Sequence, residues 1–425
     1  MMAASPQTFK DQGQSQTLDA WGRAALRPPG SAPEHAWIVK HRAAAQDLFL
    51  QTGFPRANSD DWRHMGLDAL LKPSWRAVEE AAHLELPAGS TGVDVERWDR
   101  LDRLPDFAER KSDSGPFAHL NSLFFKQATH VRVNQNVCSL QPLRIAPAPV
   151  DAGLVSTDPA VGDWMIHPRF SMVLEAGSRL DVILDCGKFL SAGRGAGVGL
   201  INWVMDIELK EQTALNLVIC GPGAGQVLNL LDIAVTQRRD SVFRAFCFET
   251  RPRQSRVALS VSLEGENAST DLFGLALLGE DSRAFHHLRV DHRVPRTQSQ
   301  QVFKSILSGT SRFEYDSLVT IHPEAPHASS EQLNKNLVLS DGARAFARPQ
   351  LAIHTDEVQC HHGATVGQMN LEELLYLRTR GIDPGSASQL VLRGFVDDLL
   401  KEIPVSAVAA ELQKQARERL EEIVR

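Results

Sequence analysis

The feature that most constrains the fold is a long central region, residues 128–365, built from short runs that alternate apolar and polar residues. Alternation with a period of two is typical of strands that bury one face. In one such run the apolar residues all fall on the same face: Val257, Leu259, Val261 and Leu263. No helical stripe of ten or more residues interrupts the region, which disfavours a βαβ sheet. The pattern predicts a mainly β core and leaves a sandwich, a barrel or a β-solenoid open.

The region before this core is predicted to be mainly helical, over residues 17–125. An apolar stripe over residues 34–53 ends at a glycine, which is typical of a helix terminus. A second helix is expected after Ser59 or Asp60, which are possible N-caps. We therefore predict an N-terminal helical domain over residues 1–127, beginning with a polar tail.

Helical patterns return after the core, and they have clear boundaries. Asn370 and Glu373 have the spacing of a capping box, and Asp383 precedes a proline at the first position of another helix. A later stripe with spacings of three and four predicts a final helix: Val405, Val408, Leu412, Ala416, Leu420 and Ile423. The predicted organisation is a β core over residues 128–367 and a C-terminal helical domain over residues 368–425.

Composition excludes several classes of protein. A net charge of −7 gives no reason to expect a nucleic-acid partner, and no run of about 20 apolar residues predicts a membrane span. The N-terminus lacks the basic start and apolar core of a signal peptide. The five cysteines are odd in number and contain no C-x-x-C pair, which disfavours a disulfide framework and a cysteine-only metal site. Free thiols favour a reducing compartment, so we expect a cytoplasmic protein.

The stretch that most invites a chemical interpretation is DEVQCHHGATVG, residues 356–367. On a strand, Cys360 and His362 share one face and stand about 6.5–7 Å apart, while His361 points the other way. A thiolate and an imidazole at this spacing could both contact the same bound ligand. A nearby imidazolium would also lower the pKa of the thiol. Two side chains do not complete such a site, so a further ligand would have to come from elsewhere, such as another chain.

The same residues also allow a purely structural interpretation. A cysteine in a strand is often a small buried apolar residue, and a histidine at a strand end is often a surface group. A second histidine-rich run, RAFHHLRVDHRV, contains His286, His287 and His292, but no recognised carboxylate–histidine spacing frames it. We expect these three histidines to be structural.

The residues from Val290 to Pro404 resemble the C-terminal part of the SufD family, a subunit of the SUF iron–sulfur cluster assembly scaffold. The resemblance is carried by VDHRVPRTQSQQVFKSILSGTSRFEYDSLVTIHPEA, by NLVLSDGARAFARPQLAIHTDEVQCHHGATVGQMNLEELLYLRTRGID and by ASQLVLRGFVDDLLKEI. Upstream, FPRANSDDWRHMGLDALL and VSLEGENASTDLFGLALL resemble two further family elements. The match is looser over residues 70–165.

This resemblance implies a right-handed parallel β-helix flanked by helical domains, with no catalytic turnover. It implies pairing with the related SufB through the β-helix and binding of the ABC-type ATPase SufC through the C-terminal helices. An isolated chain would be able to form a homodimer. The family's cysteine and histidine correspond to Cys360 and His362, at an interface where a transient iron–sulfur cluster would form. Reduced flavin on the complex is also implied, although no flavin motif is present in the sequence.

The residues expected to bind SufC lie on the first two C-terminal helices: Leu374, Leu375, Tyr376, Arg378, Arg380 and Phe395. Deletion of residues 370–425 is expected to abolish this binding and to leave the β region folded. Two other functions compete with the scaffold. A β-helix can host a carbohydrate-active lyase or hydrolase, which usually needs a carboxylate cluster in a groove, and the chain could also be a stand-alone metal-binding protein.

Overall fold

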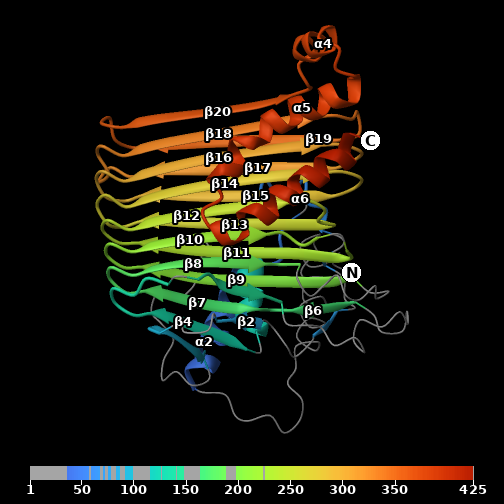
Figure 1. The fold of residues 1–425 in the computed structure, drawn as a ribbon. Helices are drawn as coiled ribbons and strands as arrows, with labels where there is room; N and C mark the ends of the chain where they lie inside the picture. Colours follow the sequence, from blue (N-terminus) through green and yellow to red (C-terminus); the bar gives the residue numbers. More distant parts are fainter. Residues whose placement is uncertain are drawn as a thin grey trace, which may run out of the picture.

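The computed structural model describes residues 36–56, 59–67, 70–71, 75–77, 83–86, 91–98, 115–125, 127–139, 141–147, 163–187, 198–223 and 225–424. Within this part the chain forms a parallel β-helix of two sheets, with helices towards both ends of the chain (Figure 1). The predicted fold class is therefore confirmed, and the solenoid is selected over a sandwich or a barrel. None of the helices in the described ranges has the length and apolar character needed to span a membrane.

From β7 to β20, consecutive strands alternate between the two sheets, so each turn of the chain adds one strand to each sheet. The first sheet has 11 strands: β3 (Val93–Arg97), β4 (Ala128–Val133), β7 (Arg169–Leu174), β9 (Gly199–Leu209), β11 (Val227–Gln237), β13 (Gln254–Leu263), β15 (Arg283–His292), β17 (Arg312–Ile321) and β19 (Arg344–Ile353), with β1 (Arg76–Ala77) and β6 (Trp164–Ile166) beside this path. The second sheet has nine: β2 (His83–Glu85), β5 (Leu143–Ala146), β8 (Arg179–Asp185), β10 (Ala214–Cys220), β12 (Val242–Glu249), β14 (Ser269–Leu278), β16 (Gln298–Leu307), β18 (Ser329–Val338) and β20 (Gln359–Gly367).

The apolar alternation fills the interior between the two sheets. Val257, Leu259, Val261 and Leu263 are 0–2% exposed and belong to one continuous core, as the sequence predicts. Parallel register places equivalent positions of successive rungs above one another, for example Ser269, Gln298, Ser329 and Gln359. These positions recur at unequal intervals in the sequence, which explains why no clean repeat is visible there.

The N-terminal region is less helical than the sequence suggests. Helix α2 (Ala36–Thr52) agrees with the prediction and ends at Gly53, whose φ is +68°. The prediction of a helix after Ser59 is wrong, because residues 59–65 form turns. These turns place Trp62 and Met65 in contact with the solenoid. Residues 1–35 and 99–114 lie outside the described residues.

Three short strands also occupy the segment that was expected to be helical. β1 and β2 have only two and three residues, and β3 pairs antiparallel with β4. This pairing supplies backbone hydrogen bonds that no local sequence pattern reveals. The other helix described in this region is α3 (Pro116–Phe124), which begins with the proline.

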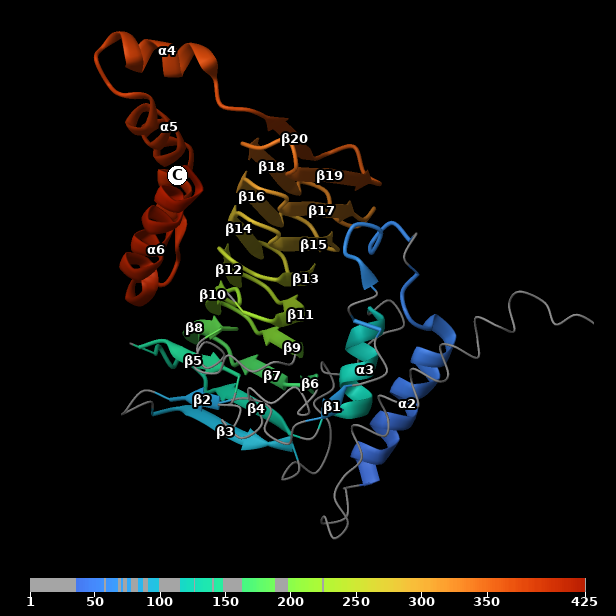
Figure 2. The same cartoon turned by 90° about the vertical axis from the view of Figure 1, so that its right-hand side faces the viewer.

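The C-terminal helices follow the predicted boundaries: α4 (Leu371–Thr379), α5 (Pro384–Asp397), the 3₁₀ helix η5 (Leu399–Glu402) and α6 (Ser406–Val424). The Asn370 side chain caps α4 by accepting from the Glu372 N–H at 2.9 Å, and Asp383 caps α5 by accepting from the Ser386 N–H at 3.0 Å. Figure 2 shows α5 and α6 running along the outside of the second sheet, whereas α4 projects beyond β20.

The predicted apolar stripe of the last helix is buried against that sheet. Leu412, Ala416 and Leu420 are at most 1% exposed and share a core with Phe246 and Ile306 of the solenoid. Removing residues 370–425 would therefore uncover an apolar face of the β-helix. This packing argues against the expectation that such a deletion leaves the β region folded.

Gly274 provides a test of the rung-stacking geometry. A methyl group at this position would approach the ring of Phe303, its partner on the next rung, to 2.2 Å. We predict that Gly274→Ala lowers the free energy of unfolding by about 1–3 kcal/mol, because overpacking strains a buried contact. Urea denaturation followed by circular dichroism measures this change.

The matched control is Gly394→Ala in α5, where an added methyl group meets nothing within 4 Å. This exposed helical position should gain about 0.5–1 kcal/mol, because alanine favours a helix more than glycine does. Equal effects of the two substitutions would contradict the stacking argument.

Candidate functional site

The candidate site lies at the open end of the β-helix. β19 pairs only with β17, and β20 pairs only with β18, so both leave a strand edge without a neighbour among the described residues. Cys360 stands in register with Ser330, and His362 with Gln332. Both partners are 1% exposed, which places Cys360 and His362 on the inward face of the last rung.

The orientation of the three candidate residues agrees with strand alternation. Cys360 is half-buried and packs against the solenoid core. His362 shares this inward face but is exposed, because no rung covers it. His361 stands in register with the exposed Glu331 and points outward. The structure thus brings Cys360 and His362 together on one face and separates His361 from them.

The interior beneath these residues is unusually polar. Buried polar side chains line the inward faces of β16 and β18: Ser299, Gln301, Ser305, Ser330, Gln332, Asn334 and Asn336. They are joined by hydrogen bonds, such as Gln332 Nε2 to Ser317 Oγ at 3.2 Å and Asn336 Nδ2 to Asn334 Oδ1 at 2.6 Å. The thiol and the imidazole therefore cap a polar interior rather than an apolar one.

The local environment tunes the Cys360 thiol in two opposing ways. Burial raises its pKa, and a hydrogen bond from the Ser330 backbone acts to lower it. A thiol and an imidazole are both soft or borderline metal ligands, and thiolates also bind iron–sulfur clusters. Two such groups at an open end can bind a metal ion or cluster whose remaining ligands come from a second surface.

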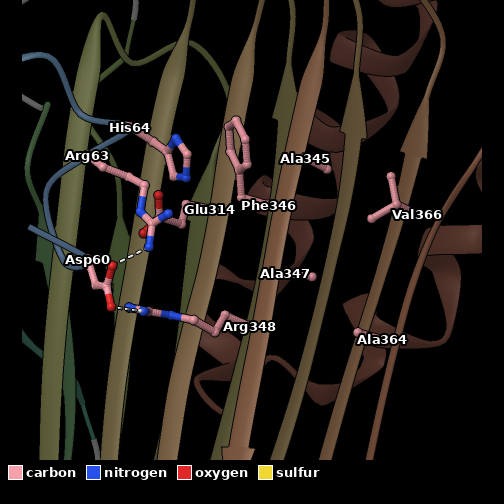
Figure 3. A pocket seen from close by; sticks show the side chains of 10 residues that line it. All are labelled: Asp60, Arg63, His64, Glu314, Ala345, Phe346, Ala347, Arg348, Ala364 and Val366. Carbon is pink, nitrogen blue, oxygen red and sulfur yellow. Dashed lines mark hydrogen bonds and ion pairs between the residues drawn. The ribbon is translucent and has the colours of Figure 1, made fainter. Parts of the chain in front are cut away.

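A second polar site lies on the outer face of the first sheet. A cavity of about 550 Å³ extends from there to the open end of the solenoid, between the N-terminal segment, β17 and β19 of the first sheet and β20 of the second (Figure 3). It is lined by Asp60, Arg63, His64, Glu314, Ala345, Phe346, Ala347, Arg348, Ala364 and Val366. The rings of His64 and Phe346 stack with centroids 3.7 Å apart, which fixes the N-terminal segment to β19.

Beside this cavity, Asp61, His287 and Asp316 place potential metal-ligand atoms within 4.8 Å of one another. A guanidinium already supplies positive charge there, since Arg348 Nη2 contacts both Asp316 and, at 3.4 Å, Asp61. Arg289 Nη1 also lies 3.3 Å from Asp316. We therefore interpret the group as an ion network that fastens the N-terminal segment to the solenoid.

The centre of this network is the buried His287 ring. Its Nε2 is 3.3 Å from Glu314 and its Nδ1 is 3.4 Å from Asp316. Burial lowers the pKa of His287 to about 3, and burial next to Asp316 raises the pKa of Glu314 to about 7. The nearby His287 ring and the hydrogen bond from Arg348 overcome burial and hold the pKa of Asp316 below its usual value. A neutral imidazole can thus donate to Asp316 and accept from protonated Glu314.

The three histidines of the histidine-rich run, His286, His287 and His292, are buried. His286 packs edge-on against Phe303 and Phe313, and His292 is hydrogen-bonded inside the solenoid. The acidic partners Glu314 and Asp316 were missed by sequence reasoning. Their alternate spacing on one strand was visible, but their pairing with His287 depends on the register of β15 and β17.

A third surface lies between α4 and α5. A cavity of about 580 Å³ there is lined by Asn370, Glu372, Glu373, Tyr376, Leu377, Leu390 and Val391. Leu371, Leu375 and Tyr376 are 79%, 60% and 59% exposed, which is unusual for large apolar side chains. Of the predicted ATPase-binding residues, Arg378 and Arg380 are also exposed and Leu374 is half-buried.

Phe395 differs from the other predicted ATPase-binding residues. It is half-buried on α5, and the Lys304 ammonium lies 5.0 Å from the centre of its ring. Its side chain therefore takes part in the attachment of α5 to the solenoid.

The fold and the open end define a parallel β-helix protein whose last rung presents a thiol and an imidazole. Comparison with protein families gives the same assignment: residues 158–395, more than half of the chain, match the SufBD core domain of SUF system FeS cluster assembly. The chain therefore belongs to the SufB/SufD family, and its role lies in iron–sulfur cluster assembly.

Individual relatives extend the similarity beyond the core. An iron–sulfur cluster assembly SufBD family protein of Synechocystis is 22% identical over 90% of this chain and 91% of its own. The iron–sulfur cluster assembly protein SufD of Escherichia coli is 24% identical over 82% of this chain and 85% of its own. A SufBD family protein of Mycobacterium leprae is 29% identical over 68% and 71%.

The ion network predicts a specific pH dependence. With a folded pKa of about 7 and an ordinary pKa of 4.5, Glu314 keeps its proton in the folded state while the unfolded state loses it. The contribution of Glu314 to the free energy of unfolding therefore falls as the pH rises from about 4.5 to about 7. We predict that Glu314→Gln, which cannot ionise, is more stable relative to the wild type at about pH 8 than at about pH 5. Urea denaturation across this range measures the difference.

Glu331→Gln is the control, because Glu331 is exposed on the outward face of β18. Its stability should follow the wild type across the same pH range. Parallel stability curves for Glu314→Gln and the wild type would show that Glu314 is ionised in the folded protein, contrary to this argument.

Proposed function

We propose that this chain is a SufD-type scaffold subunit that supplies ligands and docking surfaces rather than catalytic turnover. Its open end pairs with a SufB subunit, and its C-terminal helices bind the SufC ATPase. A nascent iron–sulfur cluster is the cargo that Cys360 and His362 help to hold. The observation that carries this proposal is the placement of both residues on the inward face of the last rung, whose outer strand edges have no neighbour among the described residues.

The unpaired edges of β19 and β20 support the pairing. A strand edge presents free N–H and C=O groups, which favour the addition of another strand. A partner rung added there would cover the exposed His362 and bring further ligands towards Cys360. In the absence of SufB, the same edges would pair with a second copy of this chain.

The exposed face of α4 supports the ATPase dock. Leu371, Leu375 and Tyr376 form an apolar surface that no described element covers, and the cavity next to α5 lies beside it. Arg378 and Arg380 add positive charge at the end of this helix. Apolar anchors with a charged rim are typical of transient protein interfaces.

The ligand proposal predicts different effects for three neighbouring substitutions. Cys360→Ser removes a soft thiolate with little change in volume, and His362→Ala removes an imidazole on the same face. Loss of a group that only hydrogen-bonds to a metal ligand lowers metal affinity about 10–100-fold. Loss of a ligand itself should cost at least as much, so each substitution should reduce cluster content at least about tenfold. His361→Ala should retain it, because this side chain points outward. Cluster absorbance and iron content of the co-purified complex measure the outcome.

Complex formation must be verified by size-exclusion chromatography for all three variants. If Cys360→Ser assembles clusters at the wild-type level in an intact complex, Cys360 is not a ligand. If His361→Ala alone loses the cluster, the site lies on the outward face.

The docking proposal is tested by point substitutions, because deleting the helices would uncover the solenoid. We expect Leu375→Glu together with Tyr376→Glu to weaken SufC binding by about 30-fold or more, as buried interface anchors contribute at least about 2 kcal/mol. Calorimetric titration of SufC into the purified chain measures the affinity.

The control is Leu50→Glu, which changes an equally exposed leucine (64%) on α2. Its affinity for SufC should match the wild type. Unchanged affinity of the α4 variant would place the dock elsewhere on the chain.

A further inference from the structure

A buried histidine is connected to the open end by a chain of hydrogen bonds inside the solenoid. His292 Nδ1 lies 2.8 Å from Thr297 Oγ1, and His292 Nε2 lies 2.9 Å from Ser299 Oγ. Ser299 Oγ is in turn 2.9 Å from Ser330 Oγ on the next rung. His292 is 0% exposed, Ser330 1% and Ser299 6%, so solvent does not compete with these contacts.

This series of hydrogen bonds ends directly beneath Cys360. Ser299, Ser330 and Cys360 occupy the same register position on β16, β18 and β20, and therefore stack on one inward column. The Ser330 backbone is also close enough to the Cys360 thiol to act against the burial that raises the pKa of this thiol. The residue in register with Cys360 is thus the residue whose hydroxyl is held, through Ser299, by His292.

The protonation state of the His292 ring determines the order of donors and acceptors in these hydrogen bonds. Burial lowers the pKa of His292 to about 4, so the ring is neutral at physiological pH, with one nitrogen donating and the other accepting. Each hydroxyl has one proton to donate, so the tautomer of His292 determines which of Ser299 and Ser330 donates to the other. Such coupled hydrogen bonds strengthen one another where the dielectric constant is low.

We propose that His292 is a positioning residue for Cys360, acting through Ser299 and Ser330 across two rungs. The inference rests on the proposed role of Cys360 and extends it to a residue far from the open surface. By fixing Ser330, these hydrogen bonds hold the Cys360 sulfur in the orientation in which it would bind a cluster or metal ion.

The test is the rate at which iodoacetamide alkylates Cys360 in the isolated full-length chain, measured on the digested peptide by mass spectrometry. Glutamine can place its amide near Nε2, where Ser299 lies, whereas asparagine can reach only the Nδ1 side. We expect His292→Asn and Ser330→Ala to slow alkylation of Cys360 by a factor of about 2 to 10, the range expected for one hydrogen bond. His292→Gln should restore most of the rate.

Two controls separate positioning from general loosening. The exposed Cys138 is an internal reference whose rate should not change in any variant. Thr270→Val alters the same inward column one rung below Ser299, but Thr270 Oγ1 has no hydrogen-bond partner in the described part of the chain, so this variant should match the wild type.

Equal rates for His292→Gln and His292→Asn would overturn the proposal, as would an unchanged rate for Ser330→Ala or slowing by Thr270→Val. The measurement requires no cluster and no partner. It can therefore succeed even if the cluster-assembly variants show that Cys360 is not a ligand, and it can fail while they show that it is.

Discussion

The stacking of each rung on the next is the interaction on which the other features of this protein depend. In a parallel β-helix, the backbone groups of one strand are satisfied by the strands on either side of it. The same register stacks side chains, so that Gly274 accommodates Phe303 and Ser330 lies beneath Cys360. Stacking must end somewhere, and at β19 and β20 it leaves free backbone groups beside exposed inward side chains. The end of the solenoid therefore presents open strand edges together with the two candidate ligands.

The interior changes character towards that end. Lower rungs bury residues such as Phe243 and Leu272, whereas the upper rungs bury amides and hydroxyls. A buried polar group is destabilising unless it is hydrogen-bonded. The amide oxygen of Gln301 meets this requirement by accepting from Tyr315 at 3.0 Å and from Ser317 at 2.7 Å, whereas its amide nitrogen has no hydrogen-bond partner in the described part of the chain. Networks of this kind hold side chains in defined orientations, and here they support the rung that carries the thiol and the imidazole.

Strand alternation and helix caps could be predicted because they are local. The inward face of residues 257–263, the cap at Asp383 and the opposite orientations of Cys360 and His361 all follow from the sequence. The solenoid itself needed the family resemblance, because its rungs recur at unequal intervals. The strand at Val93–Arg97 was missed because pairing with β4 determines it. The network around His287 could not be predicted, because it joins side chains from four segments.

The C-terminal helices show how one chain can combine a fixed and a projecting surface. α5 and α6 share an apolar core with the solenoid, and two buried cations fasten them to it. Lys304 donates to Asp398 at 2.7 Å, and Arg419 donates to the Leu277 carbonyl at 3.2 Å. No residue of α4 is buried, although α4 directly precedes this anchored pair. Because α4 contributes nothing to the core, its apolar side chains are available to a partner without loss of solenoid packing. A partner bound to α4, as proposed above, would stand at a position that the anchored helices fix relative to the rung that carries Cys360 and His362.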